Sequence, residues 1–372
     1  MSDFHQSNRV SNEKYRTELF NYVKRLVCPE NFYSSKITDP QRFYLGFKNC
    51  VAPIVNTENQ RLKESLTKTN NTHLLLLKNA ALVDSIIRVA FDCSIWLCNR
   101  TLQKKIHSKD IPIAIIARSG YGREELYLQS NLKVQIISRG GQTKEIKQVV
   151  KHLEYLFIHQ SIFQNLINAS YTSIESLEKE LGRNKTIDLL ALLEGRLIVG
   201  NSDIYLKFLK TVKKASLLQN ENLLNYCYEH NNYYEVSNTV FQQEPNVKEE
   251  LNRLYWALTL ARLKHDLKNT NQFELLDELL TNSLISVSAF KKIQSSLAFL
   301  SKVRLHLHCE QKGSYRDMMS YEVRENIAQS MGYEVKKFFH KYFYEAAYPL
   351  KKYSRNIFRE SMSQDIQKVK NL

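Results

Sequence analysis

The 372-residue sequence contains few glycines, 10 in all, few prolines, 6 in all, and no long hydrophobic run. A membrane-spanning helix needs about 20 consecutive apolar residues, whereas the apolar stretches LLLL (74–77) and IPIAIIA (111–117) are far shorter. The N-terminal residues MSDFHQSNRV also lack the apolar segment of a signal peptide. We therefore expect a folded, soluble, cytoplasmic protein without a membrane partner.

The six cysteines form no C-x-x-C pair and show no spacing typical of a zinc site or a disulfide framework. They are Cys28, Cys50, Cys93, Cys98, Cys227 and Cys309. His306 and His308 stand next to Cys309, but residues two apart on a helix face different sides, which argues against a ligand cluster. We expect buried free thiols in a reducing compartment, no metal site and no cofactor.

Basic residues outnumber acidic ones, 53 to 38, which gives a formal net charge of +15 and a pI near 9.3. Such a balance suits a polyanionic partner. However, Lys and Arg occur in pairs along the whole chain, as in KKYSR and VKKFFHK, rather than in one basic arm. This distribution is typical of solvated helix faces, so nucleic-acid binding is kept only as an alternative.

The hydrophobic pattern changes its period along the chain. Residues 1–108 space their apolar residues three and four apart, which predicts helices. Residues 111–118 and 133–139 are short, rich in β-branched residues and bounded by glycine or polar residues, which predicts two strands. The apolar run at 162–173 is a candidate for a third strand of the same sheet.

From about residue 174 the pattern is helical almost to the end of the chain. This includes TIDLLALLEGRLIVG (186–200), which predicts a helix that is apolar on more than one face. The fold class expected is α+β and mostly helical, with a small sheet. An α/β module at 109–200 would then lie between an N-terminal helical region (1–108) and a C-terminal helical domain (201–372).

Two of the scarce glycines, Gly120 and Gly122, stand two apart directly after the predicted strand IPIAIIA. Glycine at the end of a strand marks a tight turn or a close approach to the main chain. One interpretation is that a ligand approaches the backbone here. The other is that the backbone needs positive φ at these glycines and holds no ligand. The sequence leaves both open.

The segment SGYGREELYLQSNLK (119–133) resembles the signature G-[GS]-Y-G-R-x-E-L-x-P-x-S-D-x-D of bacterial protein-PII uridylyltransferase/uridylyl-removing enzymes. The nucleotidyltransferase module of that family belongs to the DNA polymerase β-like superfamily. The residues on matching positions are Gly120, Tyr121, Gly122, Arg123, Glu125, Leu126 and Ser130. The resemblance implies that residues 109–200 form a nucleotidyltransferase-like module.

Three later stretches, 187–205, 243–250 and 299–333, resemble further blocks of the same family in the same order, so the resemblance covers residues 75–360. It implies that residues 201–372 form the family's helical domain. Full-length members also carry an HD hydrolase domain and paired ACT domains. Because the sequence ends before these domains, we expect a truncated and degenerate member.

In this family two aspartates one residue apart on a strand project from the same face. They hold Mg²⁺, which neutralises the triphosphate. Asn131 and Lys133 occupy these positions, and Asp188 matches a third carboxylate. An amide oxygen is a poor ligand for a hard cation, and an ammonium group cannot ligate one. We therefore expect that the metal site and the transfer activity are lost.

The resemblance implies a phosphate or nucleotide pocket at Ser119, Gly120, Gly122, Arg123 and Ser130, with the glycine turn donating backbone N–H groups. Lys133 either takes the place of the metal charge and pairs with Asp188 or a phosphate, or points to solvent.

Two side-chain roles are also expected outside this pocket. Tyr121 is predicted to pack in the core. Arg196 and Glu194 are predicted to form a structural ion pair.

The favoured function is that of a uridylyltransferase-like pseudoenzyme with a nucleotide-binding or regulatory role. Its expected partners are UTP or another nucleotide and a PII-type protein of bacterial nitrogen regulation. One alternative is an active nucleotidyltransferase that transfers UMP or AMP to a protein. The other is a basic scaffold that binds a protein or nucleic acid.

Overall fold

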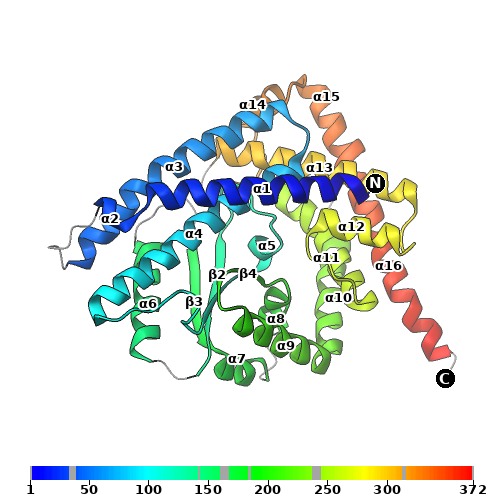
Figure 1. Ribbon diagram of the computed structural model, residues 1–372. Helices are drawn as coiled ribbons and strands as arrows, with labels where there is room; N and C mark the ends of the chain where they lie inside the picture. Colours follow the sequence, from blue (N-terminus) through cyan, green and yellow to red (C-terminus); the bar gives the residue numbers. More distant parts are fainter. Residues whose placement is uncertain are drawn as a thin grey trace. The chain divides into compact units, whose positions relative to one another are not determined.

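The computed structural model describes residues 2–32, 39–140, 143–159, 167–182, 186–236, 244–311 and 316–370 (Figure 1). The chain forms two compact units. The sheet unit comprises Arg9–Leu62 and Leu76–Gln219, and the helical unit comprises Met1–Asn8, Lys63–Leu75 and Asn220–Leu372. These units cut across the three regions predicted from the sequence, because residues 9–62 and 76–108 group with the predicted α/β module.

A four-stranded mixed sheet organises the sheet unit, with the strand order β3-β2-β1-β4 (Figure 1). Its strands are β1 (Ile113–Ala117), β2 (Leu132–Ser138), β3 (Ile167–Ser173) and β4 (Arg196–Gly200). β1 runs antiparallel to β2 and β4, and β2 runs parallel to β3. The first three strands were predicted, although residues 162–166 of the third apolar run lie outside the described residues. The α+β, mostly helical fold class is confirmed.

The fourth strand corrects the sequence prediction. Residues 186–200 were predicted as one buried helix, whereas helix α8 (Thr186–Leu193) ends before a turn and β4 follows. A short apolar run has the same appearance in a buried strand and in a buried helix. The distinguishing signal is Gly195 in the turn, where an added Cβ would lie 2.9 Å from the ring of Phe208.

Helices cover both faces of this sheet. Those in or entering the sheet unit are α1 (Ser2–Leu26), α2 (Pro29–Phe32), α3 (Pro40–Lys68), α4 (Thr72–Leu102), α5 (Ser119–Gly122), α6 (Lys144–Glu154), π-helical η1 (Tyr155–His159), α7 (Ile174–Leu181), α8 and α9 (Ser202–Leu218). Apolar residues of α1, α3, α4 and α6 share one core cluster with Ile115, Val134 and Ile136. The opposite face packs against α7 and α9, and near the start of β2 it becomes polar, with Lys133 and Gln135.

The helical unit is built around α11 (Val247–His265), which contacts α10, α12, α13 and α16. Its other helices are α10 (Asn220–Val236), α12 (Gln272–Thr281), α13 (Val287–Glu310), α14 (Arg324–Ser330), α15 (Val335–His340), π-helical η3 (Lys341–Ala347) and α16 (Tyr348–Lys370). None of the described helices has both the length and the apolar character to cross a membrane.

Two sequence blocks that resemble the family meet in the helical unit. Arg304 and His308 both bond the Asp317 carboxylate, at 2.6 and 3.0 Å. The carbonyl oxygen of Asp317 in turn accepts a hydrogen bond at 3.0 Å from Val247 N, at the start of α11. These motif residues therefore hold the fold of this unit together.

All six thiols are free, but only three of them are buried, Cys93, Cys98 and Cys227, while the other three are half-buried. His306 forms a hydrogen bond with Ser330 Oγ at 2.9 Å, whereas His308 bonds Asp317, so the two histidines have different partners. Within the described ranges, no group of three or more His, Cys, Asp or Glu side chains is placed to hold a metal ion.

Candidate functional site

The glycine turn follows β1 and closes on itself through main-chain hydrogen bonds. The N–H groups of residues 122–125 donate to carbonyl groups of residues 118–121 at 2.8–3.1 Å. Positive φ occurs at Ser119 (56°) and Glu124 (61°). These four amides therefore hold the turn, and they are not free to hold a phosphate.

Neither glycine of the turn has positive φ, so that interpretation of Gly120 and Gly122 is wrong. An added Cβ at Gly122 would lie 2.1 Å from the Glu194 carbonyl oxygen and 2.9 Å from that of Ala117. At Gly120 the nearest atoms would be 3.6 Å away. Glycine is therefore required at position 122 because main-chain atoms of the protein itself, and not a ligand, lie too close for a Cβ atom.

Arg123 links this turn to the segment before β4. Its Nε donates to Glu125 Oε2 at 2.9 Å and its Nη1 donates to Glu194 Oε2 at 2.8 Å. Both carboxylates are buried. The expected Arg196–Glu194 ion pair is wrong, because Glu194 pairs with Arg123. Arg123, predicted to bind a nucleotide, makes these two bonds within the protein.

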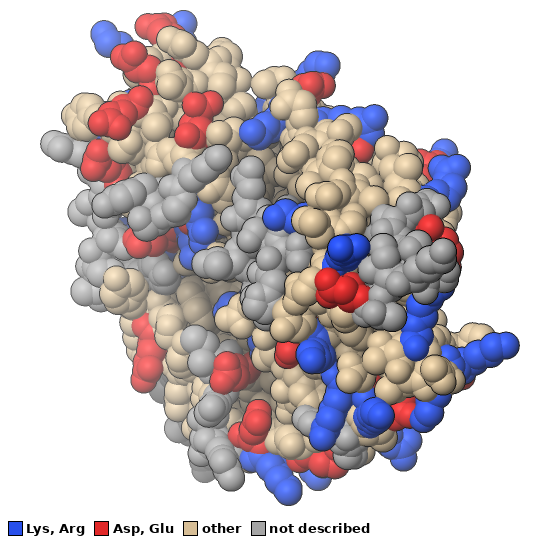
Figure 2. All heavy atoms as spheres, turned by 90° about the vertical axis from the view of Figure 1, so that its left-hand side faces the viewer, with Lys and Arg blue, Asp and Glu red and all other residues tan. Residues whose placement is uncertain are grey.

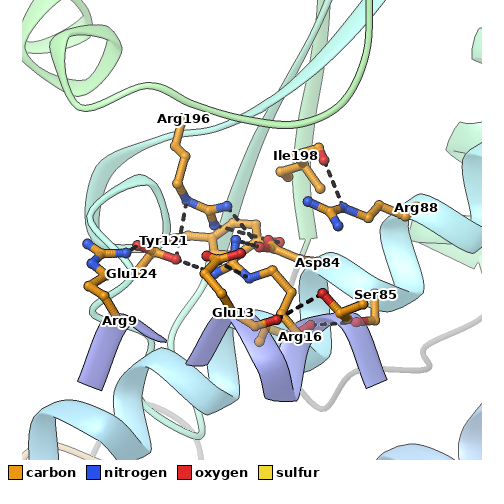
Figure 3. A network of polar contacts seen from close by, with 12 residues as sticks. Arg9, Glu13, Arg16, Asp84, Ser85, Arg88, Tyr121, Glu124, Arg196 and Ile198 are labelled. Atoms are coloured by element: carbon orange, nitrogen blue, oxygen red, sulfur yellow. Dashed lines mark hydrogen bonds and ion pairs between the residues drawn. The ribbon is translucent and has the colours of Figure 1, made fainter. Parts of the chain in front are cut away.

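A second buried network lies beside the turn, around Asp84 of α4 (Figure 3). Asp84 is fully buried and accepts hydrogen bonds from the Tyr121 hydroxyl at 2.6 Å and from Arg196 Nη1 at 2.8 Å. Arg16 Nη1 of α1 lies 3.1 Å from its Oδ2. Tyr121 is 1% exposed, which confirms its predicted role in packing.

Glu124, on the turn, completes this network by pairing with Arg9 and Arg16 of α1 (Figure 3). Burial alone would raise the pKa of Glu124. The guanidinium groups of Arg196, Arg9 and Arg16 outweigh burial and lower that pKa to about 2. The turn is therefore fixed by charge pairing as well as by its main-chain bonds.

This depressed pKa predicts a loss of stability in acid. The pKa of Glu124 rises from about 2 in the folded chain to roughly 4.3 on unfolding. The ionised group thus contributes about 3 kcal/mol above pH 4.3, and this contribution is lost as the pH falls towards 2. Urea unfolding between pH 7 and pH 3 should show a weaker pH dependence in Glu124→Gln than in the wild type.

The exposed carboxylate of Glu180 provides the matched control. Glu180→Gln should keep the wild-type pH dependence. If Glu124→Gln and the wild type lost stability in parallel, the role assigned to Glu124 would be contradicted.

The polar end of the sheet face brings residues of three strands together. Arg118 follows β1 and lies opposite Lys133 of β2, with Arg118 N donating to Lys133 O at 2.9 Å. Its Nη2 donates to Ser170 Oγ of β3 at 3.2 Å, and Ser170 Oγ donates to Gln135 Oε1 at 2.7 Å. The side chains of Arg118, Lys133, Gln135 and Ser170 therefore share one face.

The sequence-predicted carboxylate positions lie at or near this face. Asn131 and Lys133 are exposed, Ser130 is half-buried, and Asp188 is exposed in the first turn of α8. Among the described residues, Lys133 and Asp188 form no ion pair with each other. Asp188 acts instead on Arg118: burial lowers the pKa of that guanidinium, and Asp188 raises it.

Sequence reasoning missed Arg118, Gln135 and Ser170. Gln135 could have been found, because it is two residues after Lys133 on a predicted strand and must share its face. Arg118 immediately precedes the signature, and only the antiparallel register places it opposite Lys133.

The residues at this face do not fit the Mg²⁺ that the resemblance implies. Of the three positions that match family carboxylates, only Asp188 is an acid. Arg118 and Lys133 add two positive charges to the same face. Two unit charges about 4 Å apart repel each other by about 4 kcal/mol at an effective dielectric constant of 20, so a divalent cation is disfavoured there.

Comparison with known proteins supports the resemblance. The sequence profile of the family described as GlnD PII-uridylyltransferase matches residues 227–358, within the helical unit. A bifunctional uridylyltransferase/uridylyl-removing enzyme of Haemophilus influenzae (strain 86-028NP) is 27% identical over 234 residues, 61% of this chain and 26% of that enzyme. The enzymes so named from Zymomonas mobilis and Erythrobacter litoralis are 24% and 26% identical, over 82% and 72% of this chain.

The family profile covers residues 227–358 and these relatives are 24–27% identical, so the chain is similar in sequence to the uridylyltransferases. The chain is a divergent relative of the bifunctional uridylyltransferase/uridylyl-removing enzymes. It spans about a quarter to a third of the length of the relatives described, 26% of the Haemophilus enzyme and 34% of the Zymomonas enzyme.

Proposed function

We propose that the chain is a cytoplasmic, regulatory pseudoenzyme of the uridylyltransferase type that binds a nucleotide without transferring it. UTP is the proposed nucleotide and a PII-type signalling protein the proposed partner. The observation that carries the proposal is the pair of residues at the carboxylate positions, Asn131 and Lys133, with Arg118 opposite Lys133. A site with this charge favours an anion and disfavours the cation needed for transfer.

The experiment restores the two carboxylates. Thermal unfolding is measured with UTP, first with Mg²⁺ and then with a chelator, because a ligand that binds only the folded chain raises the melting temperature. We expect UTP to raise the melting temperature of the wild type, and by the same amount with Mg²⁺ and with chelator. Asn131→Asp/Lys133→Asp should respond more strongly with Mg²⁺, because two carboxylates on one strand face bind a divalent cation.

A charge reversal away from the site controls for the change in net charge. Lys147 is exposed on α6, and Lys147→Asp should leave the wild-type response unchanged. A Mg²⁺-dependent UTP response of the wild type, or nucleotidyl transfer to a PII-type protein, would overturn the proposal in favour of an active enzyme.

The alternative of a nucleic-acid-binding scaffold gains no support from the surface in Figure 2. Lys and Arg side chains gather towards the lower right of that view, with Asp and Glu side chains among them. In the sheet unit, moreover, Arg16, Arg123 and Arg196 pair with buried carboxylates. Their charge is therefore neutralised within the fold.

A further inference from the structure

We propose that Arg118, Lys133 and Ser170 form a metal-independent binding site for a phosphoryl group at the polar end of the sheet face. This inference rests on the proposed function for the location of the site. It adds the residues that hold the ligand and the class of ligand, a phosphate or pyrophosphate group. Arg118, which lies outside the signature, is the central residue of the proposed site.

The first observation is that two basic residues stand opposite each other on neighbouring strands and share one face of the sheet. The register places Ala117 opposite Val134, and hence Arg118 opposite Lys133. Directly opposite residues of an antiparallel pair have Cβ atoms about 5 Å apart, and like charges there are destabilising. An anion held between the two side chains would remove that repulsion.

The second observation is that the Arg118 guanidinium is largely enclosed and lacks a bonded carboxylate. In the described structure its side chain donates to Ser170 Oγ, while its Nε is buried without a hydrogen-bond partner. Arg16, Arg123 and Arg196 of the same unit each contact a carboxylate. Arg118 therefore has unused hydrogen-bonding capacity, and no carboxylate bonds it among the described contacts.

The third observation is that the guanidinium is held in place. Ser170 Oγ donates its proton to Gln135 Oε1 and so must accept from Arg118 Nη2. This fixed acceptor orients the planar group from one side. Asp188 raises the pKa of Arg118, but it is exposed and forms no ion pair with it among the described contacts.

These features select a phosphoryl group. A guanidinium presents parallel N–H donors that match two oxygens of a phosphate, and an ammonium adds a compact positive charge. The two cations exceed the single charge of Asp188, so a multiply charged anion fits better than a carboxylate. Inorganic pyrophosphate and the phosphates of a nucleotide share this chemistry.

The test uses inorganic pyrophosphate as the probe, in chelator and at constant ionic strength. The melting temperature of the wild type should rise with pyrophosphate. Arg118→Met should weaken the apparent affinity by about tenfold or more, the expected loss of a charge-assisted contact. Lys133→Met should also weaken it, Arg118→Lys should retain part of it, and Lys147→Met on α6 should leave it unchanged.

A second readout separates binding from a structural role. Without pyrophosphate, Arg118→Met should melt at the wild-type temperature or higher, because it removes an enclosed charge that no carboxylate bonds directly among the described contacts. A purely structural arginine would instead lower the melting temperature and leave the pyrophosphate affinity of the folded chain intact.

The outcomes distinguish this inference from the proposed function. If pyrophosphate has no effect, or stabilises Arg118→Met as well as the wild type, the inference is wrong. If UTP in chelator raises the melting temperatures of the wild type and of Arg118→Met equally, the chain binds a nucleotide, but not at Arg118. If the wild-type response needs Mg²⁺, the proposed loss of the metal site fails and this metal-independent site fails with it.

Discussion

Replacing Asp84 by alanine should lower the free energy of unfolding by about 3–5 kcal/mol, the cost of breaking a buried ion pair from one side. Asp84 is fully buried and neutralises Arg196 and Arg16 while accepting the Tyr121 hydroxyl. Its removal leaves Arg16 and Arg196 to share the Glu124 carboxylate with Arg9. Urea unfolding followed by far-ultraviolet circular dichroism measures the loss.

Asp92, also on α4, is the matched control. It is about a third exposed and pairs with Lys24 at 3.3 Å, so Asp92→Ala should cost about 1 kcal/mol or less. If Asp84→Ala does not fold, Asp84→Asn keeps an acceptor for Tyr121 and still tests the charge. Losses of similar size in the Asp84 and Asp92 variants would show that the network contributes little.

Replacing Gly122 by alanine should cost about 3 kcal/mol or more, because the new methyl group overlaps main-chain atoms that cannot rotate away. The Cβ would lie 2.1 Å from the carbonyl oxygen of Glu194. The turn and the start of β4 would have to separate, which strains the Arg123–Glu194 ion pair. Equilibrium unfolding in urea is the measurement.

Gly120 lies two residues away in the same turn and provides the control. Its nearest neighbours are 3.6 Å from the added Cβ, an ordinary contact distance, so Gly120→Ala should change stability by less than about 1 kcal/mol. Equal losses at the two glycines would mean that the turn tolerates no side chain for a reason other than this close approach.

Much of the fold could be predicted because its signals are local. The change of hydrophobic period indicated β1 and β2, and a third apolar run indicated β3. β4 was missed because its three apolar residues, Leu197, Ile198 and Val199, carry no period that separates a strand from a helix. The strand becomes recognisable only when it pairs with β1.

The candidate site was predicted in its residue types but not in its contacts. The identities of Asn131 and Lys133 were visible in the sequence. The partners of the signature residues were not, because ion pairs such as Arg9–Glu124 join residues 115 positions apart. The pairing of Arg196 with Asp84, and the location of Arg118 opposite Lys133, likewise depend on tertiary structure.

The division of the chain between its two units has a consequence for its synthesis on the ribosome. Every segment of the sheet unit has been made once Gln219 is reached, so that unit can fold while translation continues. Lys63–Leu75 must wait for the C-terminal helices, where Thr72 Oγ1 bonds Ala298 O and Lys302 Nζ bonds Asn70 Oδ1. Leu66 and Leu75 belong to this segment and are buried in the finished protein. The nascent chain can therefore pass through a stage in which the sheet unit is complete while Lys63–Leu75 still lacks the hydrogen bonds that it makes with the C-terminal helices.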